Sequence, residues 1–301
     1  MTLPNFLVIG ASKGGTTTIH QVLDQHPQVF MCPVKEVGFF WSYGEPVEFH
    51  GPGQEKLRNR LVNDLDRYQA LFKNAANEKA LGESSVRYIS TPRAPKVIHD
   101  LIPQAKLIAS LRQPADRAYS SYMHNLRDGV EPCSQFAEAV AQELNGERDD
   151  WTFCRYLSRG FYSVQIKRYL EYFEKEQLHI SLFEDLKNNP KTLFRGLYRF
   201  LKVDEKFSPD LSHKHNVSGV IKNPVLRNMW TRTGRLRTAM RPLMSDRLRH
   251  AATEWFMRDL EKPQFPQELR EELTEYFRQD IEQLQDLIGR DLSHWLTPVK
   301  S

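Results

Sequence analysis

A glycine-rich segment near the start of the chain has the composition of a phosphate-binding loop. Residues 10–18 read GASKGGTTT and lie between an apolar run at Phe6–Ile9 and an amphipathic segment at Thr16–Gln25. This order predicts strand, loop and helix, so the backbone N–H groups at the helix start would face one anion. A Walker loop carries its lysine directly before the Ser/Thr, but Thr16 occupies that place here and the lysine is Lys13. The segment therefore predicts a phosphate site of a different kind.

A second basic residue follows another predicted strand. The apolar run Leu107–Leu111 leads directly into Arg112, where a metal-assisted phosphotransferase would place an acidic residue. An arginine there favours direct binding of a phosphate, because its planar guanidinium matches two phosphate oxygens. An ordinary glycine-rich turn is the alternative interpretation of the first loop, and Lys13 with three threonines at a helix start argues against it.

Alternating apolar segments predict the fold that positions these residues. Short strands are expected at Phe6–Ile9, Lys79–Leu81, Lys106–Leu111 and Leu178–Leu182, and helices between them at Pro92–Leu101, Ala115–Leu126 and Phe161–Phe173. This alternation predicts an α/β fold of the P-loop-like, three-layer kind, with a central, mostly parallel sheet flanked by helices.

The pattern changes after Pro190 and becomes helical to the end, apart from a loop at Ser208–Pro224. Glu268–Ile288 has an apolar stripe typical of a long closing helix, and Gly289 is its expected stop. We predict a single domain over residues 1–301, with a nucleotide-binding α/β core at 1–225 and a helical C-terminal region at 226–301.

Composition narrows the class of protein. The chain has 301 residues, of which 40% are hydrophobic and 27% charged, with a net charge of +4, which is typical of a soluble globular protein and gives no reason to expect a nucleic-acid partner. Three widely spaced cysteines (Cys32, Cys133 and Cys154) fit neither a disulfide framework nor a zinc site, so we expect reduced thiols. No apolar stretch reaches the ~18–20 residues of a bilayer span, and the first residues do not resemble a signal peptide, so we expect a cytoplasmic protein.

Two separated motifs together resemble the sulfotransferases that use 3'-phosphoadenosine 5'-phosphosulfate (PAPS). Residues 13–17, KGGTT, are similar to the loop that binds the 5'-phosphosulfate in that family. The run LRQP at 111–114, followed by RAYSSY at 117–122, is similar to the 3'-phosphate signature. The resemblance covers roughly residues 5–225 and is nearest to the branch of bacterial sulfotransferases and heparan-modifying enzymes.

The resemblance implies a role for each matching residue. Lys13 would contact the oxygen that bridges phosphate and sulfuryl group, and Arg112 with Ser120 would hold the 3'-phosphate. The implied residues around the 5'-phosphate and in a closing segment are Gly14, Gly15, Thr16, Thr17, Thr18, Gly219 and Lys222. None of these roles requires a metal.

The general base has several candidates. Residues 35–40, KEVGFF, resemble the K-E-x-x-F-F segment that carries the catalytic glutamate of the heparan-type branch, which makes Glu36 the first choice. A surface carboxylate paired with Lys35 is the alternative. His124 is the strongest rival, because other branches use a histidine and it lies four residues after Ser120. His20, His213 and His215 are weaker candidates.

The resemblance implies in-line transfer of a sulfuryl group from PAPS to a hydroxyl of a glycan, lipid or small molecule, with adenosine 3',5'-bisphosphate as product. A P-loop kinase-like phosphotransferase and a non-catalytic polyanion-binding protein are the alternatives. Residues 227–249, with seven arginines and one acid, would be the contact surface of the latter. The same segment fits a solvated helical face, or contact with an anionic glycan or a membrane surface.

Overall fold

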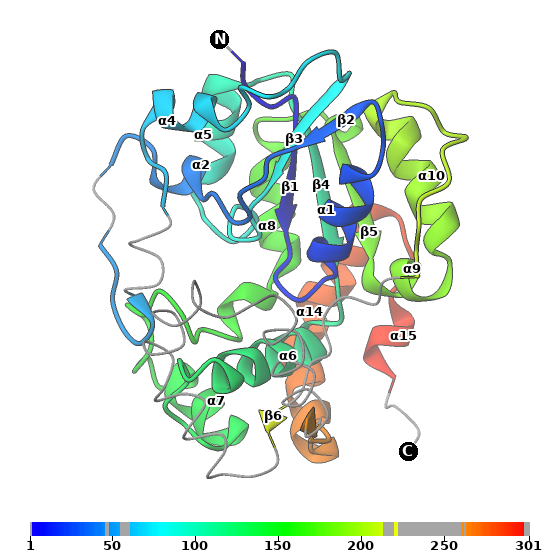
Figure 1. The fold of residues 1–301 in the computed structure, drawn as a ribbon. Helices are drawn as coiled ribbons and strands as arrows, with labels where there is room; N and C mark the ends of the chain where they lie inside the picture. Colours follow the sequence, from blue (N-terminus) through cyan, green and yellow to red (C-terminus); the bar gives the residue numbers. More distant parts are fainter. Residues whose placement is uncertain are drawn as a thin grey trace.

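Five parallel strands form the central sheet, in the order β2-β3-β1-β4-β5 (Figure 1). The structure is a computed structural model that describes residues 2–45, 48–54, 61–212, 220–221, 260–261 and 263–297. The strands are β1 (Phe6–Gly10), β2 (Val29–Met31), β3 (Ala80–Ser84), β4 (Lys106–Leu111) and β5 (Leu178–Leu182). All neighbouring pairs in this sheet are parallel, so the carboxyl ends of the strands meet at one edge, where ligands bind in open α/β sheets.

Helices cover both faces of this sheet (Figure 1). In the described part of the chain the helices are α1 (Thr16–Asp24), α2 (Phe39–Ser42), α4 (Leu65–Ala70), α5 (Ala94–Leu101), α6 (Pro114–Arg127), α7 (Phe136–Leu144), α8 (Tyr162–Leu170), α9 (Phe183–Asn188), α10 (Pro190–Leu201), α14 (Gln267–Ile288) and α15 (Ser293–Leu296). Side chains alternate between the two faces of a strand. Phe6 and Val8 of β1 therefore pack with α1 and α10, whereas Leu7 and Ile9 pack with α5, α6, α8 and α14. This arrangement confirms the three-layer α/β fold.

The long helix α14 of the C-terminal region is hydrogen-bonded to helices of the core. Arg270 donates to Asp116 of α6, with Nε 2.9 Å from Oδ1. Asp280 accepts from Ser163 of α8, whose Oγ lies 2.5 Å from Oδ1. The helix ends at Gly289, which has φ 64° in the left-handed region, as its sequence predicted. These contacts hold α6, which carries several of the candidate site residues.

Most predicted strands and helices lie where expected, with one correction. The strands at Lys106–Leu111 and Leu178–Leu182 match exactly. Among the described residues the C-terminal region is helical as predicted, with α14 and α15, except that Leu260–Glu261 (β7) forms a short strand that pairs antiparallel with Val220–Ile221 (β6). Strands of two residues are too short to show an alternating pattern in the sequence. The predicted boundary at 225/226 lies outside the described residues.

Two further observations concern the expected class of protein. The three cysteines are buried free thiols, as predicted. None of the helices in the described part of the chain combines the length and the apolar composition that a bilayer crossing needs.

Candidate active site

The loop between β1 and α1 is held tightly against the end of β4. The backbone N–H of Ala11 donates to the carbonyl of Ser110 (2.9 Å), and the Ser110 hydroxyl donates to the carbonyl of Gly14 (2.6 Å). A Cβ at Gly14 would lie 2.0 Å from the Ser110 carbonyl oxygen. Gly15 has φ 89° and begins α1. Gly14 is therefore required because the chain passes close to the Ser110 carbonyl. Gly15 is required because its backbone is left-handed.

Gly14→Ala is expected to displace the loop from β4 and to destabilise the protein by about 1–3 kcal/mol, the usual cost of overpacking. Gly196→Ala on α10 is the matched control, because its Cβ would meet nothing closer than 3.8 Å. Denaturant unfolding of both variants measures the difference. Equal unfolding midpoints for the two variants would mean that the loop adjusts freely around Gly14.

The start of α1 has the electrostatic character of an anion site. No side chain caps the helix at Gly15, and its first turn contains no acidic residue, so the helix start retains its positive end. Burial, and then the charges of Arg127 and Arg112, lower the pKa of Lys13 to about 8. A bound phosphate would relieve both causes, because it would replace lost hydration and neutralise the crowded cations. The predicted phosphate loop fits such a group.

Arg112 and Ser120 lie where the second motif predicted them. Arg112 follows β4 directly, and its guanidinium carbon lies 4.9 Å from the ring centre of Phe183. Burial lowers the pKa of Arg112. Asp116 is engaged with Arg270, and within the described ranges no carboxylate forms a salt bridge with Arg112. Ser120 is 7% exposed on α6. This part of the site can bind a second anion.

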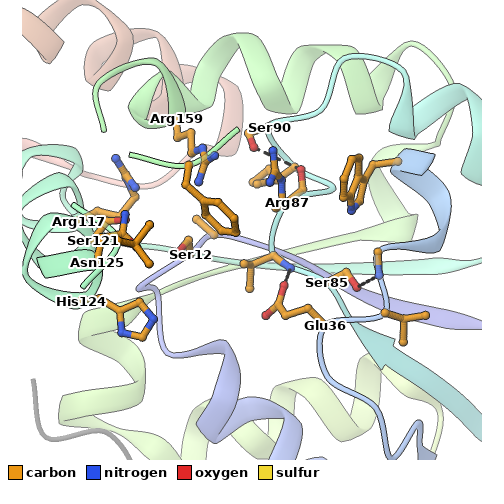
Figure 2. Close-up of a pocket in the computed structure, with 18 of the residues that line it drawn as sticks. Ser12, Glu36, Ser85, Arg87, Ser90, Arg117, Ser121, His124, Asn125 and Arg159 are labelled. Carbon is orange, nitrogen blue, oxygen red and sulfur yellow. Dashed lines mark hydrogen bonds between the residues drawn. The ribbon is translucent and has the colours of Figure 1, made fainter. Parts of the chain in front are cut away.

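A cavity of about 280 Å³ lies beside the loop (Figure 2). Ser12 of the loop, Glu36 and His124 all line it, although they come from three separate segments of the chain. Lys13 is not part of the cavity lining. Its charge interacts with that of Asp128, which lines the cavity. The structure thus brings both main candidates for the base to one cavity next to the predicted phosphate loop.

Glu36 is a fixed carboxylate. Its Oε2 accepts from the backbone N–H of Val86 and its Oε1 from Nζ of Lys35, both at 2.7 Å, and the side chain is 39% exposed. The pairing with Lys35 is the one that the sequence allowed as an alternative. Glu36 also lines the cavity, so it is more than a surface carboxylate paired with a lysine.

A buried network on β3 positions the segment that carries Glu36. The Ser85 hydroxyl donates to Glu83 (2.8 Å) and accepts from the backbone N–H of Gly38 (3.0 Å). Tyr88 donates to the other oxygen of Glu83 at 2.5 Å and accepts from the N–H of Phe40 at 3.3 Å. Burial raises the pKa of Glu83 to about 7. Glu83 therefore acts as a support beneath the cavity wall.

The histidines differ in their surroundings. Nδ1 of His124 accepts from Nη2 of Arg127 at 2.8 Å, and its Nε2 lies 3.7 Å from Asp128. His20 lies 3.0 Å from the Ser84 hydroxyl and does not line the cavity, and burial followed by the charge of Lys35 lowers its pKa to about 4. His124 is thus the histidine at the cavity.

Several sequence predictions fall on residues outside the described ranges: Gly219, Lys222, His213, His215 and the basic segment 227–249. Within the described ranges, no group of three His, Cys, Asp or Glu side chains is placed to hold a metal ion.

Sequence reasoning assigned no function to five residues of the cavity wall, which are Trp41, Arg87, Arg117, Phe153 and Arg159. Arg117 belongs to the RAYSSY segment, and Arg87 belongs to residues 83–88, which resemble the segment that lines the acceptor side in the sulfotransferases. Nothing in their spacing shows that they face one cavity. The other three come from distant segments and become neighbours only through tertiary folding.

Comparison with known proteins agrees with this geometry. The model of the sulfotransferase domain family matches residues 3–287. The chain belongs to this sulfotransferase family. The chain is 32% identical over 212 residues to mouse bifunctional heparan sulfate N-deacetylase/N-sulfotransferase 4, an alignment that covers 68% of this chain and 23% of that protein. It therefore spans less than a quarter of the length of this curated relative.

For two further relatives, the alignment with this chain covers a larger share of the relative. The membrane-associated sulfotransferase kil1 of Dictyostelium discoideum is 24% identical over 283 residues, which covers 68% of this chain and 57% of kil1. The crystal structure of a sulfotransferase from Alicyclobacillus acidocaldarius superposes with a TM-score of 0.76 at 33% identity, over 99% of this chain and 100% of that one. The chain therefore shares the fold of that bacterial protein.

Proposed function

We propose that the chain transfers the sulfuryl group of PAPS to a hydroxyl of an acceptor bound in the cavity. The observation that carries the proposal is the position of the Lys13 loop, which lies beside a cavity lined by Glu36 and His124. Family membership supports sulfuryl transfer, and the two anion sites at the α1 start and at Arg112 suit the 5' and 3' phosphates of PAPS. This proposal also treats residues 1–301 as one domain that acts in the cytoplasm.

In the proposed reaction, the chain positions and polarises the reacting groups. Glu36 accepts the proton of the acceptor hydroxyl. At the same time the hydroxyl oxygen attacks the sulfur atom from the side opposite to the S–O bond that breaks. Lys13 donates to the oxygen that bridges sulfur and phosphorus, and so stabilises the charge that develops there. The first turn of α1, from Thr16 to Thr18, holds the 5'-phosphate with its N–H groups, and Arg112 with Ser120 holds the 3'-phosphate. Positioning and charge stabilisation supply most of the rate in related phosphoryl transfers.

Glu36 is the better placed of the two bases. Since Nδ1 of His124 accepts a hydrogen bond from Arg127, the proton of a neutral ring lies on Nε2, and no lone pair is left for the acceptor. Glu36 keeps free lone pairs on both oxygens beside the hydrogen bonds that it accepts from Lys35 and Val86. We therefore assign the base to Glu36 and a supporting position to His124.

An amine acceptor is the second outcome to test, because the heparan sulfate relatives are named as N-sulfotransferases. Neither the kinase-like nor the polyanion-binding alternative gains support, since the family that matches is a sulfotransferase family and the segment that would bind a polyanion lies outside the described residues.

Binding of adenosine 3',5'-bisphosphate tests the donor. In a metal-free thermal-shift titration, we expect the bisphosphate to stabilise the protein by about 2.7 kcal/mol at 100 times its dissociation constant, and ADP to stabilise it much less. Arg112→Ala should lower the affinity for the bisphosphate by roughly tenfold to 100-fold, because a charge-assisted pair to the 3'-phosphate is lost. Arg278→Ala, an exposed arginine of α14, is the control. Preference for ADP with magnesium, or no effect of Arg112→Ala, would exclude this proposal.

A further inference from the structure

Three arginines line the cavity on the side away from the proposed base. In the view of Figure 2, Arg87, Arg117 and Arg159 lie along one side of the cavity and Glu36 and His124 along the other. The arginines come from the segment after β3, from α6 and from the short 3-10 helix at Ser158–Gly160. The fold thus gathers three positive charges where the reaction proposed above needs none.

The guanidinium groups have unused donors. Nη1 of Arg87, and Nε and Nη1 of Arg117, are buried and have no hydrogen-bond partner among the described residues. Arg117 is 1% exposed, and one of its nitrogens donates to the carbonyl of Tyr156. Arg159 donates to the carbonyl of Thr152 at 2.6 Å. Buried donors without partners are rare in native proteins, so each such group calls for a ligand or another explanation.

The charges of Glu36 and Glu143 act on the three arginines, but both carboxylates have their own hydrogen-bond partners. Glu36 pairs with Lys35, and Asp128 pairs with Arg127. Glu143 accepts from the backbone N–H groups of Leu157 (3.0 Å) and Ser158 (2.9 Å). Within the described ranges no salt bridge joins a carboxylate to any of the three cavity arginines.

The arginines also oppose one another electrostatically. Burial, and then the charge of Arg159, lower the pKa of Arg87 to about 9. Burial, and then the charge of Arg117, lower the pKa of Arg159 to about 10. An anion between them would remove this repulsion.

Part of the remaining wall is apolar and aromatic. The guanidinium carbon of Arg87 lies 4.8 Å from the ring centre of Trp41 and 5.8 Å from that of Phe153. Val37, Leu61, Ile89 and Val130 add to the apolar lining, beside polar residues such as Ser121 and Asn125. A cavity of about 280 Å³ is at the small end of sites for small molecules, so it suits one ring or a short chain.

We propose that Arg87, Arg117 and Arg159 form the subsite for an anionic group of the acceptor. The acceptor is then a small hydroxylated molecule with an apolar body and a carboxylate or a similar anionic oxygen group. Its anion lies at the arginines and its hydroxyl lies across the cavity, at Ser12 and Glu36. This inference rests on the proposed function for the role of the hydroxyl, while the anion subsite itself can be tested by binding alone.

Matched pairs of phenols test the subsite. The probes are 4-hydroxybenzoate, 4-hydroxyphenylacetate and 4-hydroxybenzenesulfonate, each compared with its neutral amide or sulfonamide by calorimetry in saturating adenosine 3',5'-bisphosphate. At least one anion is expected to bind about tenfold or more tightly than its neutral partner, as a charge-assisted pair predicts. Carboxylate and sulfonate arms distinguish the two kinds of anion. If no anion binds more tightly than its neutral partner, the proposal is wrong.

Variants locate the effect. Arg87→Gln should abolish the preference for the anion, and Arg87→Lys should retain part of it. Arg159→Gln should also abolish the preference, and it replaces Arg87→Gln in the test if the Arg87 variants fail to fold. Arg278→Gln, on the surface of α14, should leave the preference unchanged. A preference that survives both glutamine variants would overturn the assignment of the subsite.

Failure of the subsite and failure of the proposed function give different results. If the bisphosphate binds but anions and neutral partners bind equally, only the subsite is wrong. If the bisphosphate does not bind, the same titrations without it still measure the preference, and Arg87→Gln shows whether that preference comes from this cavity or from the phosphate loop.

Discussion

Replacing Glu36 with glutamine is expected to lower the rate constant of sulfuryl transfer by about 10²–10⁴-fold, the usual contribution of a positioned general base. Glutamine keeps the size of the side chain and can still accept from the N–H of Val86, so the cavity wall should remain in place. The lost pair with Lys35 is partly exposed and contributes about 1 kcal/mol or less to stability. Single-turnover transfer of the sulfuryl group from PAPS to the free hydroxyl of a phenol from the panel above measures the effect.

Two variants make this result specific to Glu36. His124→Gln should reduce transfer less, because the ring nitrogens of His124 face Arg127, the last residue of α6, and Asp128, which follows it. Glu275→Gln on the surface of α14 should have no effect. Affinity for adenosine 3',5'-bisphosphate should be the same in all three variants. A greater loss in His124→Gln than in Glu36→Gln would reverse the assignment of the base.

The fold was predictable from sequence where a segment is long or fully buried. The strand at Phe6–Gly10 is buried along its whole length, and such strands read as continuous apolar runs. The edge strand Val29–Met31 has three residues and was missed, since so short a run has no measurable period. The helix Phe136–Leu144 was also missed, because the sequence around it has no strong start signal: Gln135 precedes it without a side-chain cap.

The sequence suggests residues for the proposed nucleotide side of the site more readily than for the proposed acceptor side. Lys13 and Arg112 belong to short contiguous segments, in which one strand end and the next helix start fix the position of the residue. Glu36 could be selected by its motif, but its contacts with the β3 network depend on tertiary packing. Arg159 and Phe153 come from a segment without a recognisable pattern, and only the folded chain places them beside Arg87. Substrate-binding walls are generally built from such separate loops.

Affinity for adenosine 3',5'-bisphosphate should fall as the pH rises above about 8, because Lys13 loses its proton in the free protein. Its pKa is lowered from 10.5 to about 8, so the free lysine is charged below that pH and neutral above it. The bound phosphate favours the charged form, and binding above pH 8 therefore requires uptake of a proton. The dissociation constant should rise by up to about tenfold per pH unit, and proton uptake should be visible in calorimetry in buffers of different ionisation enthalpy.

Lys13→Arg separates this effect from other titrations, since an arginine stays protonated over the whole range. Its affinity for the bisphosphate should be nearly independent of pH between 8 and 10, with no proton uptake. The cavity arginine Arg87, whose pKa is lowered to about 9, titrates nearby, and Arg87→Gln should keep the slope of the unmodified protein because it acts on the acceptor and not on the nucleotide. A slope that persists in Lys13→Arg, or that disappears in Arg87→Gln, would show that another group binds the proton and that the loop lysine does not hold the phosphate.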